Sequence, residues 1–196
     1  MFGVTKSPMT LSKEEQARLL DVLAKDGNPR DLALVSLALA TGLRLRELVG
    51  LNVGHVAPNA SEMAWRIDLP KSLTKGGRGG VAFLSRRVRS RLVRYLAWKR
   101  AQGESLEPEA ALFQSRTRWR ISLRRVQVIF AAWQQRAGFE RIYNFHALRH
   151  TAITNVYRAT KDLYLTQRFA RHASPLTTTA YTHPSDEELY SAISRI

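Results

Sequence analysis

The segment HALRH, residues 146–150, places two histidines four residues apart on a predicted helix, the spacing of a zinc-binding pair. A zinc protease helix also needs a glutamate beside the first histidine, and Ala147 stands there. No nearby acidic residue offers a third ligand, and Arg149 between the histidines would repel a dication. We therefore expect no metal at this pair. His146 and Arg149 lie three residues apart and suit a phosphate ligand, although His146 is equally explained as a structural histidine.

Two segments earlier in the chain supply further cations. In TGLRLREL, residues 41–48, Arg44 follows Gly42, and Glu47 lies three residues on. Glu47 is placed to orient Arg44 or merely to pair with it, and Arg44 is alternatively a surface residue at a helix boundary. In SLTKGGRGG, residues 72–80, Lys75 stands in a turn whose glycines permit close approach to a ligand. An ordinary hairpin with solvated charges is the alternative.

The segments ARHAS, residues 170–174, and LTTTAYTHP, residues 176–184, add a histidine and a tyrosine. His172 lies nine residues before Tyr181. The neighbours of Tyr181 are polar and form no apolar run that its ring could join. Tyr181 is therefore either a packing residue near the end of the chain or a phenol that performs chemistry.

The segments between these residues are mostly helical in pattern. Ser12 and Glu15 form a capping box for a first helix, and the apolar run 32–42 predicts a buried helix that ends at Gly42. A short helical piece follows at 43–51. Segments 62–70 and 81–85 alternate as two strands joined by the glycine-rich turn. Further helices are expected after Ser85, from about Ser122 to Gly138, over 144–157 and over 162–172. We therefore expect a mainly α fold with a small antiparallel β-hairpin.

Composition points to a polyanionic partner. The 196 residues carry a formal net charge of +15, and the basic residues favour arginine, which binds phosphate through a planar fork. Nucleic acid is the commonest such partner, and an anionic membrane surface is the alternative. The absence of cysteine excludes disulfides, thiol catalysis and cysteine-ligated metals. The chain has no segment with the pattern of a membrane span or a signal peptide, so we expect a cytoplasmic protein.

Together, these segments resemble the tyrosine recombinase family, which includes phage integrases, the Xer recombinases, Cre and the fimbrial invertases. The resemblance spans Thr41 to His183, most of the chain, and its most specific part is HALRH, followed by RHAS and AYTH. It implies a catalytic set with one supporting acid: Arg44, Lys75, His146, Arg149, His172 and Tyr181, supported by Glu47.

The resemblance also implies a role for each of these residues. Tyr181 would attack a DNA phosphate and form a 3′-phosphotyrosyl bond, while the two arginines hold the non-bridging oxygens. Lys75 would protonate the departing 5′-oxygen, His146 would assist proton removal from Tyr181, and His172 would bond the phosphate. No metal and no nucleotide cofactor is implied, because the arginines supply the positive charge and the phosphotyrosine retains the energy of the broken bond.

The sequence departs from the family pattern at two places. The family usually has Leu-Gly before the second histidine, where this chain has Ala170 and Arg171, so Arg171 becomes a candidate DNA contact. Only about forty residues precede Arg44, so we expect residues 1–184 to form the catalytic domain, without an N-terminal core-binding domain. The chain is then either a minimal recombinase or a catalytic fragment of a longer protein.

Two rival functions share parts of this pattern. A type IB topoisomerase uses similar chemistry but reseals the same strand, and a DNA-binding regulator could keep the fold without catalysis. The family works as a homotetramer on paired sites in double-stranded DNA, while an isolated domain could be monomeric. The tail 185–196 is predicted as a short amphipathic helix that packs on its own domain or docks on a neighbour. A bacterial, phage or plasmid origin with a place at the nucleoid follows from the same resemblance.

Overall fold

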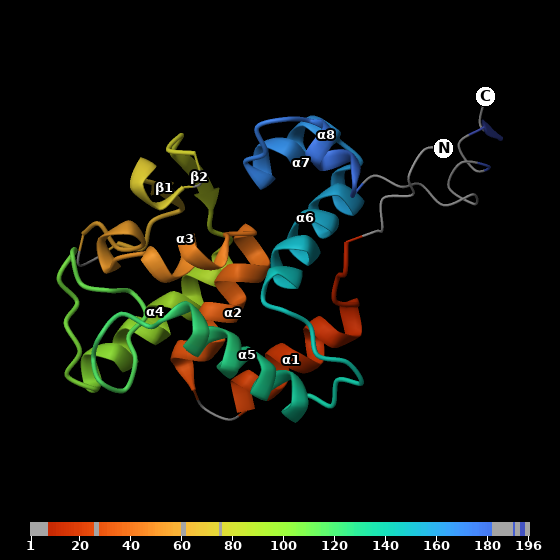
Figure 1. The fold of residues 1–196 in the computed structure, drawn as a ribbon. Helices are drawn as coiled ribbons and strands as arrows, with labels where there is room; N and C mark the ends of the chain where they lie inside the picture. The colour runs from red at the N-terminus through yellow and green to blue at the C-terminus, as the bar shows by residue number, and fades with distance from the viewer. Residues whose placement is uncertain are drawn as a thin grey trace.

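The computed structural model of the chain describes residues 8–25, 28–59, 62–74, 76–181, 190 and 193–194. Helix α2 (Pro29–Thr41) forms the centre of the fold and packs against α1 (Lys13–Lys25), α4 (Arg86–Ala101) and α6 (His146–Thr160) (Figure 1). Its sequence explains this position, because Leu34, Val35 and Leu37 point to different sides of the helix and all three are buried. The apolar run therefore forms the predicted buried helix.

Serine side chains cap the starts of three helices, and one of these caps was predicted from the sequence. The Ser12 backbone N–H donates to Glu15 Oε2 at 2.7 Å and the Glu15 N–H donates to Ser12 Oγ at 3.1 Å, which confirms the capping box before α1. Ser85 and Ser122 each accept from the third residue after them, and thereby start α4 and α5 (Leu123–Arg136). Hydroxyl-bearing residues thus set where these helices begin.

A two-stranded antiparallel sheet follows the first three helices. Helix α3 (Leu45–Gly50) and the 3-10 turn η1 (Val53–His55) lead to β1 (Arg66–Leu69), a second 3-10 turn η2 (Lys71–Leu73) and β2 (Gly80–Phe83). The register pairs Leu69 with Gly80 next to the turn. Ile67 and Leu69 are buried on one face of β1, as their alternation with polar residues predicts.

Helix α6 is followed by α7 (Leu163–Ala170) and by a short helix α8 (Leu176–Thr179). Figure 1 shows the hairpin and the α7–α8 pair both at the upper side of the molecule, with α3 below them. Helix α8 was not predicted from the threonine-rich sequence. Because it directly precedes Tyr181, it fixes where this tyrosine emerges.

The structure therefore has the expected mainly helical class with one small antiparallel sheet. The predicted tail helix lies almost entirely outside the described residues. Within the described ranges, no helix is long and apolar enough to cross a membrane.

Candidate active site

The site begins where α2 ends. Gly42 terminates α2 in the left-handed region with φ 58°, and a Cβ at this position would lie 3.2 Å from Cε1 of Phe169. Glycine is therefore favoured both by the left-handed backbone and by the close approach of α7. The turn places Arg44 at the start of α3, with its side chain 30% exposed.

Glu47 lies beneath Arg44 as a buried anion. The Arg44 backbone N–H donates to Glu47 Oε2 at 2.8 Å, and Arg44 Nη1 donates to Glu47 Oε1 at 2.9 Å. The Glu47 side chain is only 1% exposed, so its charge is compensated by arginine rather than by water. The backbone contact caps the start of α3, and the side-chain contact orients a guanidinium that remains partly accessible.

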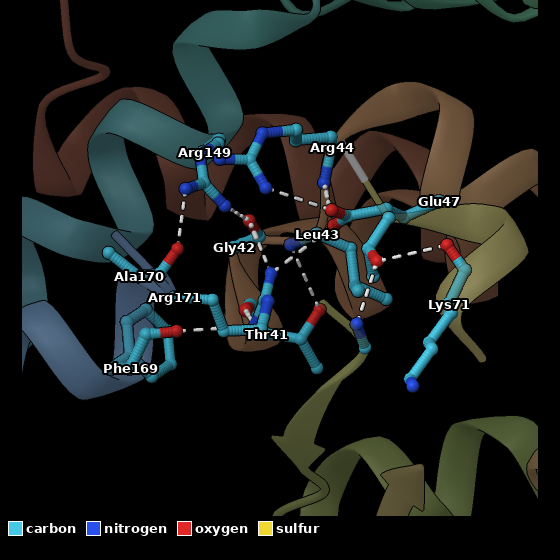
Figure 2. Close-up of polar contacts among 12 residues, drawn as sticks. Thr41, Gly42, Leu43, Arg44, Glu47, Lys71, Arg149, Phe169, Ala170 and Arg171 are labelled. Carbon is cyan, nitrogen blue, oxygen red and sulfur yellow. Dashed lines mark hydrogen bonds and ion pairs between the residues drawn. The ribbon is translucent and has the colours of Figure 1, made fainter. Parts of the chain in front are cut away.

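Arg149 is held by the ends of two helices. Its Nη1 donates to the Gly42 carbonyl and its Nη2 donates to the Ala170 carbonyl at 2.6 Å (Figure 2). Burial, followed by the charges of Arg44 and Arg171, lowers the pKa of the Arg149 guanidinium to about 10, so the group stays charged at neutral pH. These bonds use two of the five guanidinium N–H donors.

Tyr181 reaches this cluster through a histidine that the sequence reasoning considered only as a zinc ligand. His150 Nδ1 and the Tyr181 hydroxyl lie 2.6 Å apart, and the ring of His146 packs edge-on against His150 with a centroid distance of 4.6 Å. The contact to the phenol therefore comes from His150, with His146 behind it. The signal for His150 was its four-residue spacing from His146, which puts both rings on one helix face.

His172 lies on another side of the phenol. Its ring stacks near Tyr181 at a centroid distance of 6.1 Å, and its Nδ1 lies 3.0 Å from Thr178 Oγ1 on α8. Burial, followed by the charges of Arg149 and Arg44, lowers the pKa of His172 to about 4. The expected histidine thus stands beside the tyrosine and is uncharged at neutral pH.

Burial disfavours the charged form of both Tyr181 and His150. It raises the pKa of Tyr181, while the nearby Arg149 and Arg44 charges oppose that shift. Burial, followed by His146 and Arg149, lowers the pKa of His150 to about 4. At neutral pH the pair is a phenol next to a neutral imidazole, which is able to accept a proton.

The structure does not place Lys75, and it places Arg171 differently from the prediction. Lys75 lies outside the described residues, so its predicted role is untested; the glycines after it, Gly76, Gly77 and Gly79, all have positive φ, as a tight turn requires. Arg171 was expected as a DNA contact, but its side chain turns inward and is 9% exposed.

Among the described residues, no group of three histidines or acids could hold a metal ion.

This arrangement joins a tyrosine, neutral histidines and two charged arginines on a small helical domain, which is the set of groups needed to form a covalent bond to a phosphodiester. The model of the phage integrase family matches residues 9–188, and the chain belongs to this family.

Individual relatives agree with that assignment. The chain is 30% identical over 192 residues to tyrosine recombinase XerC of Caldanaerobacter subterraneus subsp. tengcongensis, covering 97% of this chain and 51% of the relative. Its fold is similar to the crystal structure of XerA recombinase, with a TM-score of 0.79, 26% identity, and coverage of 100% of this chain and 66% of the other.

A further structural relative was solved with its substrate. The pre-cleavage complex of XerH site-specific recombinase bound to difH has a TM-score of 0.77 and 23% identity, with 98% of this chain and 56% of the other covered. The chain thus spans about half the length of the curated relative it matches. The predicted tyrosine recombinase catalytic-domain fold is confirmed.

Proposed function

We propose that this chain is the catalytic domain of a site-specific recombinase that cuts and rejoins DNA through a 3′-phosphotyrosine bond. The observation that carries the proposal is the 2.6 Å contact between the Tyr181 hydroxyl and a neutral His150, beside Arg44 and Arg149. A phenol becomes a nucleophile when a base takes its proton and fixed cations stabilise the charge that develops on phosphorus.

In the cleavage step, the Tyr181 oxygen attacks the scissile phosphorus and the phenolic proton passes to His150 Nδ1. The bond from phosphorus to the 5′-oxygen breaks, and Lys75 donates the proton that this oxygen takes up. Arg44 and Arg149 hold the two non-bridging oxygens, and His172 adds a further hydrogen bond to the phosphate. His146, packed against His150, supports that ring from behind.

Rejoining reverses these transfers on a different strand. A 5′-hydroxyl attacks the phosphotyrosine and gives its proton to Lys75, while the phenolate leaves and regains its proton from His150. Each step exchanges one phosphoester bond for another, so neither a metal nor a nucleotide enters the proposed reaction.

The low pKa of His150 fits a base that acts only on DNA. In the free protein, burial, followed by His146 and the charge of Arg149, disfavours the imidazolium of His150, so proton transfer from Tyr181 is uphill. A bound phosphodiester brings a negative charge next to these groups, which raises the pKa of His150. DNA binding would thereby activate the nucleophile.

The proposed partner is double-stranded DNA, engaged as a homotetramer on paired sites in the bacterial cytoplasm at the nucleoid. The net charge of +15 supports a DNA partner, because phosphate neutralisation by basic side chains drives such binding. The XerH relative was crystallised with its DNA substrate.

Nicked suicide duplexes from the genomic neighbourhood of the gene test the proposal. The nick lets the short 5′-hydroxyl strand diffuse away, so the protein remains trapped on the DNA as an adduct that persists in detergent. Tyr181→Phe should abolish this adduct because the attacking oxygen is gone. Tyr164→Phe is the matched control, since Tyr164 is 75% exposed on α7, and should form the adduct at the wild-type rate.

An adduct that persists in Tyr181→Phe would contradict the nucleophile assignment. Relaxation of supercoiled DNA that lacks any special site would favour the topoisomerase alternative instead. Strand exchange between two sites would support the recombinase.

A further inference from the structure

Arg171 occupies a backbone position that disfavours its side chain. It ends α7 with φ 55° and ψ 41°, in the left-handed region that glycine adopts most easily. A non-glycine residue here needs compensating contacts, and the structure provides them on the inner side of the site.

The guanidinium of Arg171 lies where the carboxyl ends of two helices meet. Its Nη1 donates to the Thr41 carbonyl at 3.3 Å and to the Phe169 carbonyl at 3.2 Å, and its Nη2 donates to the Gly42 carbonyl at 3.2 Å (Figure 2). Carbonyls at a helix carboxyl end carry partial negative charge, so they favour a cation. Arg171 thereby joins the end of α2 to the end of α7.

The same guanidinium contacts the supports of both phosphate-facing arginines. Its Nη2 lies 3.4 Å from Glu47 Oε2, and Glu47 also holds Arg44. The Gly42 carbonyl that Arg171 bonds is also an acceptor for Arg149. A displacement of Arg171 would therefore disturb the immediate supports of Arg44 and Arg149 together.

The stem of Arg171 lies against the hairpin. A Cβ built on Gly80, the first residue of β2, would lie 2.8 Å from Arg171 Cδ, a distance too short for two carbon atoms. Because the guanidinium is anchored by several bonds, the stem cannot simply swing away. Gly80 does not have a positive φ, so an alanine there meets this clash without backbone strain.

We propose that Arg171 is a positioning residue that fixes three parts of the active site relative to one another: the Arg44–Glu47 pair, the α7 end that precedes His172, and the hairpin whose turn contains Lys75. This inference rests on the proposed function, since its kinetic consequence is a rate of DNA cleavage. Its structural part is measurable without DNA: the change in melting temperature caused by Gly80→Ala should depend on which residue stands at position 171.

The experiment uses the full chain with Arg171→Gly, Gly80→Ala and the double variant. Arg171→Gly relieves the left-handed strain but removes the anchor, so the single-turnover cleavage rate should fall at least tenfold while the Kd for DNA changes less than threefold. Gly80→Ala should lower both the cleavage rate and the melting temperature in the wild-type background. In the Arg171→Gly background it should change neither, because the clashing stem is absent.

Two further variants control for charge and for folding. Arg168→Ala removes one positive charge from an exposed position on α7 and should leave the single-turnover rate at saturating DNA unchanged. Arg171→Lys keeps the stem and the charge but lacks the planar fork, so it should cleave at a rate between those of Arg171→Gly and the wild type. If Arg171→Gly does not fold, Arg171→Lys decides, and a wild-type cleavage rate in that variant overturns the proposal.

Equal losses from Gly80→Ala in both backgrounds would also overturn it, because the two positions would then act independently. If the wild-type protein forms no adduct, the proposed function fails, yet the coupling of melting temperatures between positions 80 and 171 still tests the structural part. An adduct in the wild type with unchanged rates in all variants defeats the positioning role alone.

Discussion

His150 is the residue whose surroundings most directly define the chemistry proposed for Tyr181. It lies between His146 and the phenol. Burial lowers the pKa of His150 to about 4, so the ring is uncharged at neutral pH. A neutral imidazole accepts the phenolic proton, whereas an imidazolium cannot. The rate of cleavage should therefore depend on the protonation of this one ring.

We predict that His150→Gln slows single-turnover cleavage about 10²- to 10⁴-fold, the range for loss of a general base. In the wild type, the rate should fall as the pH decreases through the pKa of His150, which bound phosphate raises from about 4 toward its ordinary value of 6.5. Above that pKa the base is neutral and the rate should be level. Cleavage of a suicide duplex from pH 4.5 to 8 measures both effects.

The pH dependence distinguishes the base from its neighbours. His150→Gln should lose the acidic decline, while His55→Gln, a substitution of a part-buried histidine whose Nδ1 accepts from the Asn52 backbone, should retain it. A His150→Gln protein that keeps the acidic decline at an unchanged rate would assign the proton to another group.

At the scale of elements, the junction of α2 with α7 positions the arginines. Gly42 turns the chain from α2 toward Arg44, and its carbonyl accepts bonds from Arg149 and Arg171. Phe169 on α7 lies close to Gly42, so a Cβ at this position would make a tight contact of 3.2 Å with the Phe169 ring. The positions of Arg44, Arg149 and Arg171 thus all depend on this one glycine.

We predict that Gly42→Ala lowers the free energy of unfolding by about 1–2 kcal/mol from its left-handed backbone, with an additional loss from the contact with Phe169. Gly138→Ala is the matched control, because Gly138 has φ 67° but a Cβ there would meet nothing within 4 Å. Chemical denaturation of both variants separates the two contributions. Equal losses would show that the approach of Phe169 contributes nothing.

At the scale of the whole molecule, an excess of arginine over acidic residues defines the electrostatics. The chain has 31 lysines and arginines against 16 acidic residues. Some of these arginines are internal, such as Arg149 and Arg171, so they add little to the charge that the outer surface presents to DNA. The exposed remainder supplies the field that attracts a polyanion.

We predict that affinity for duplex DNA decreases steeply with salt, by about 10³-fold or more between 50 and 200 mM if six or more phosphates are contacted. Fluorescence anisotropy over that range gives the slope of log Kd against log salt. Tyr181→Phe should show the same slope, because it removes no charge. A slope smaller than that for a single phosphate would contradict a backbone-driven mode of DNA binding.

The sequence alone determined much of the fold because its signals are local. The capping box of Ser12 and Glu15, the apolar run that ends at Gly42, and the alternation in β1 each act within a few residues, and the structure follows them. Residue order along the chain was also sufficient to recognise the family that the comparisons confirm.

The tertiary structure decided how the candidate residues meet. His146 and His150 share one helix face, so their spacing could not say which ring contacts Tyr181; only the packed position of Tyr181 after α8 places the phenol against His150. Arg171 looked like a surface cation, but most of its partners come from residues more than 120 positions away in sequence. Long-range packing sets both outcomes, because a side chain's direction depends on what the fold places beside it.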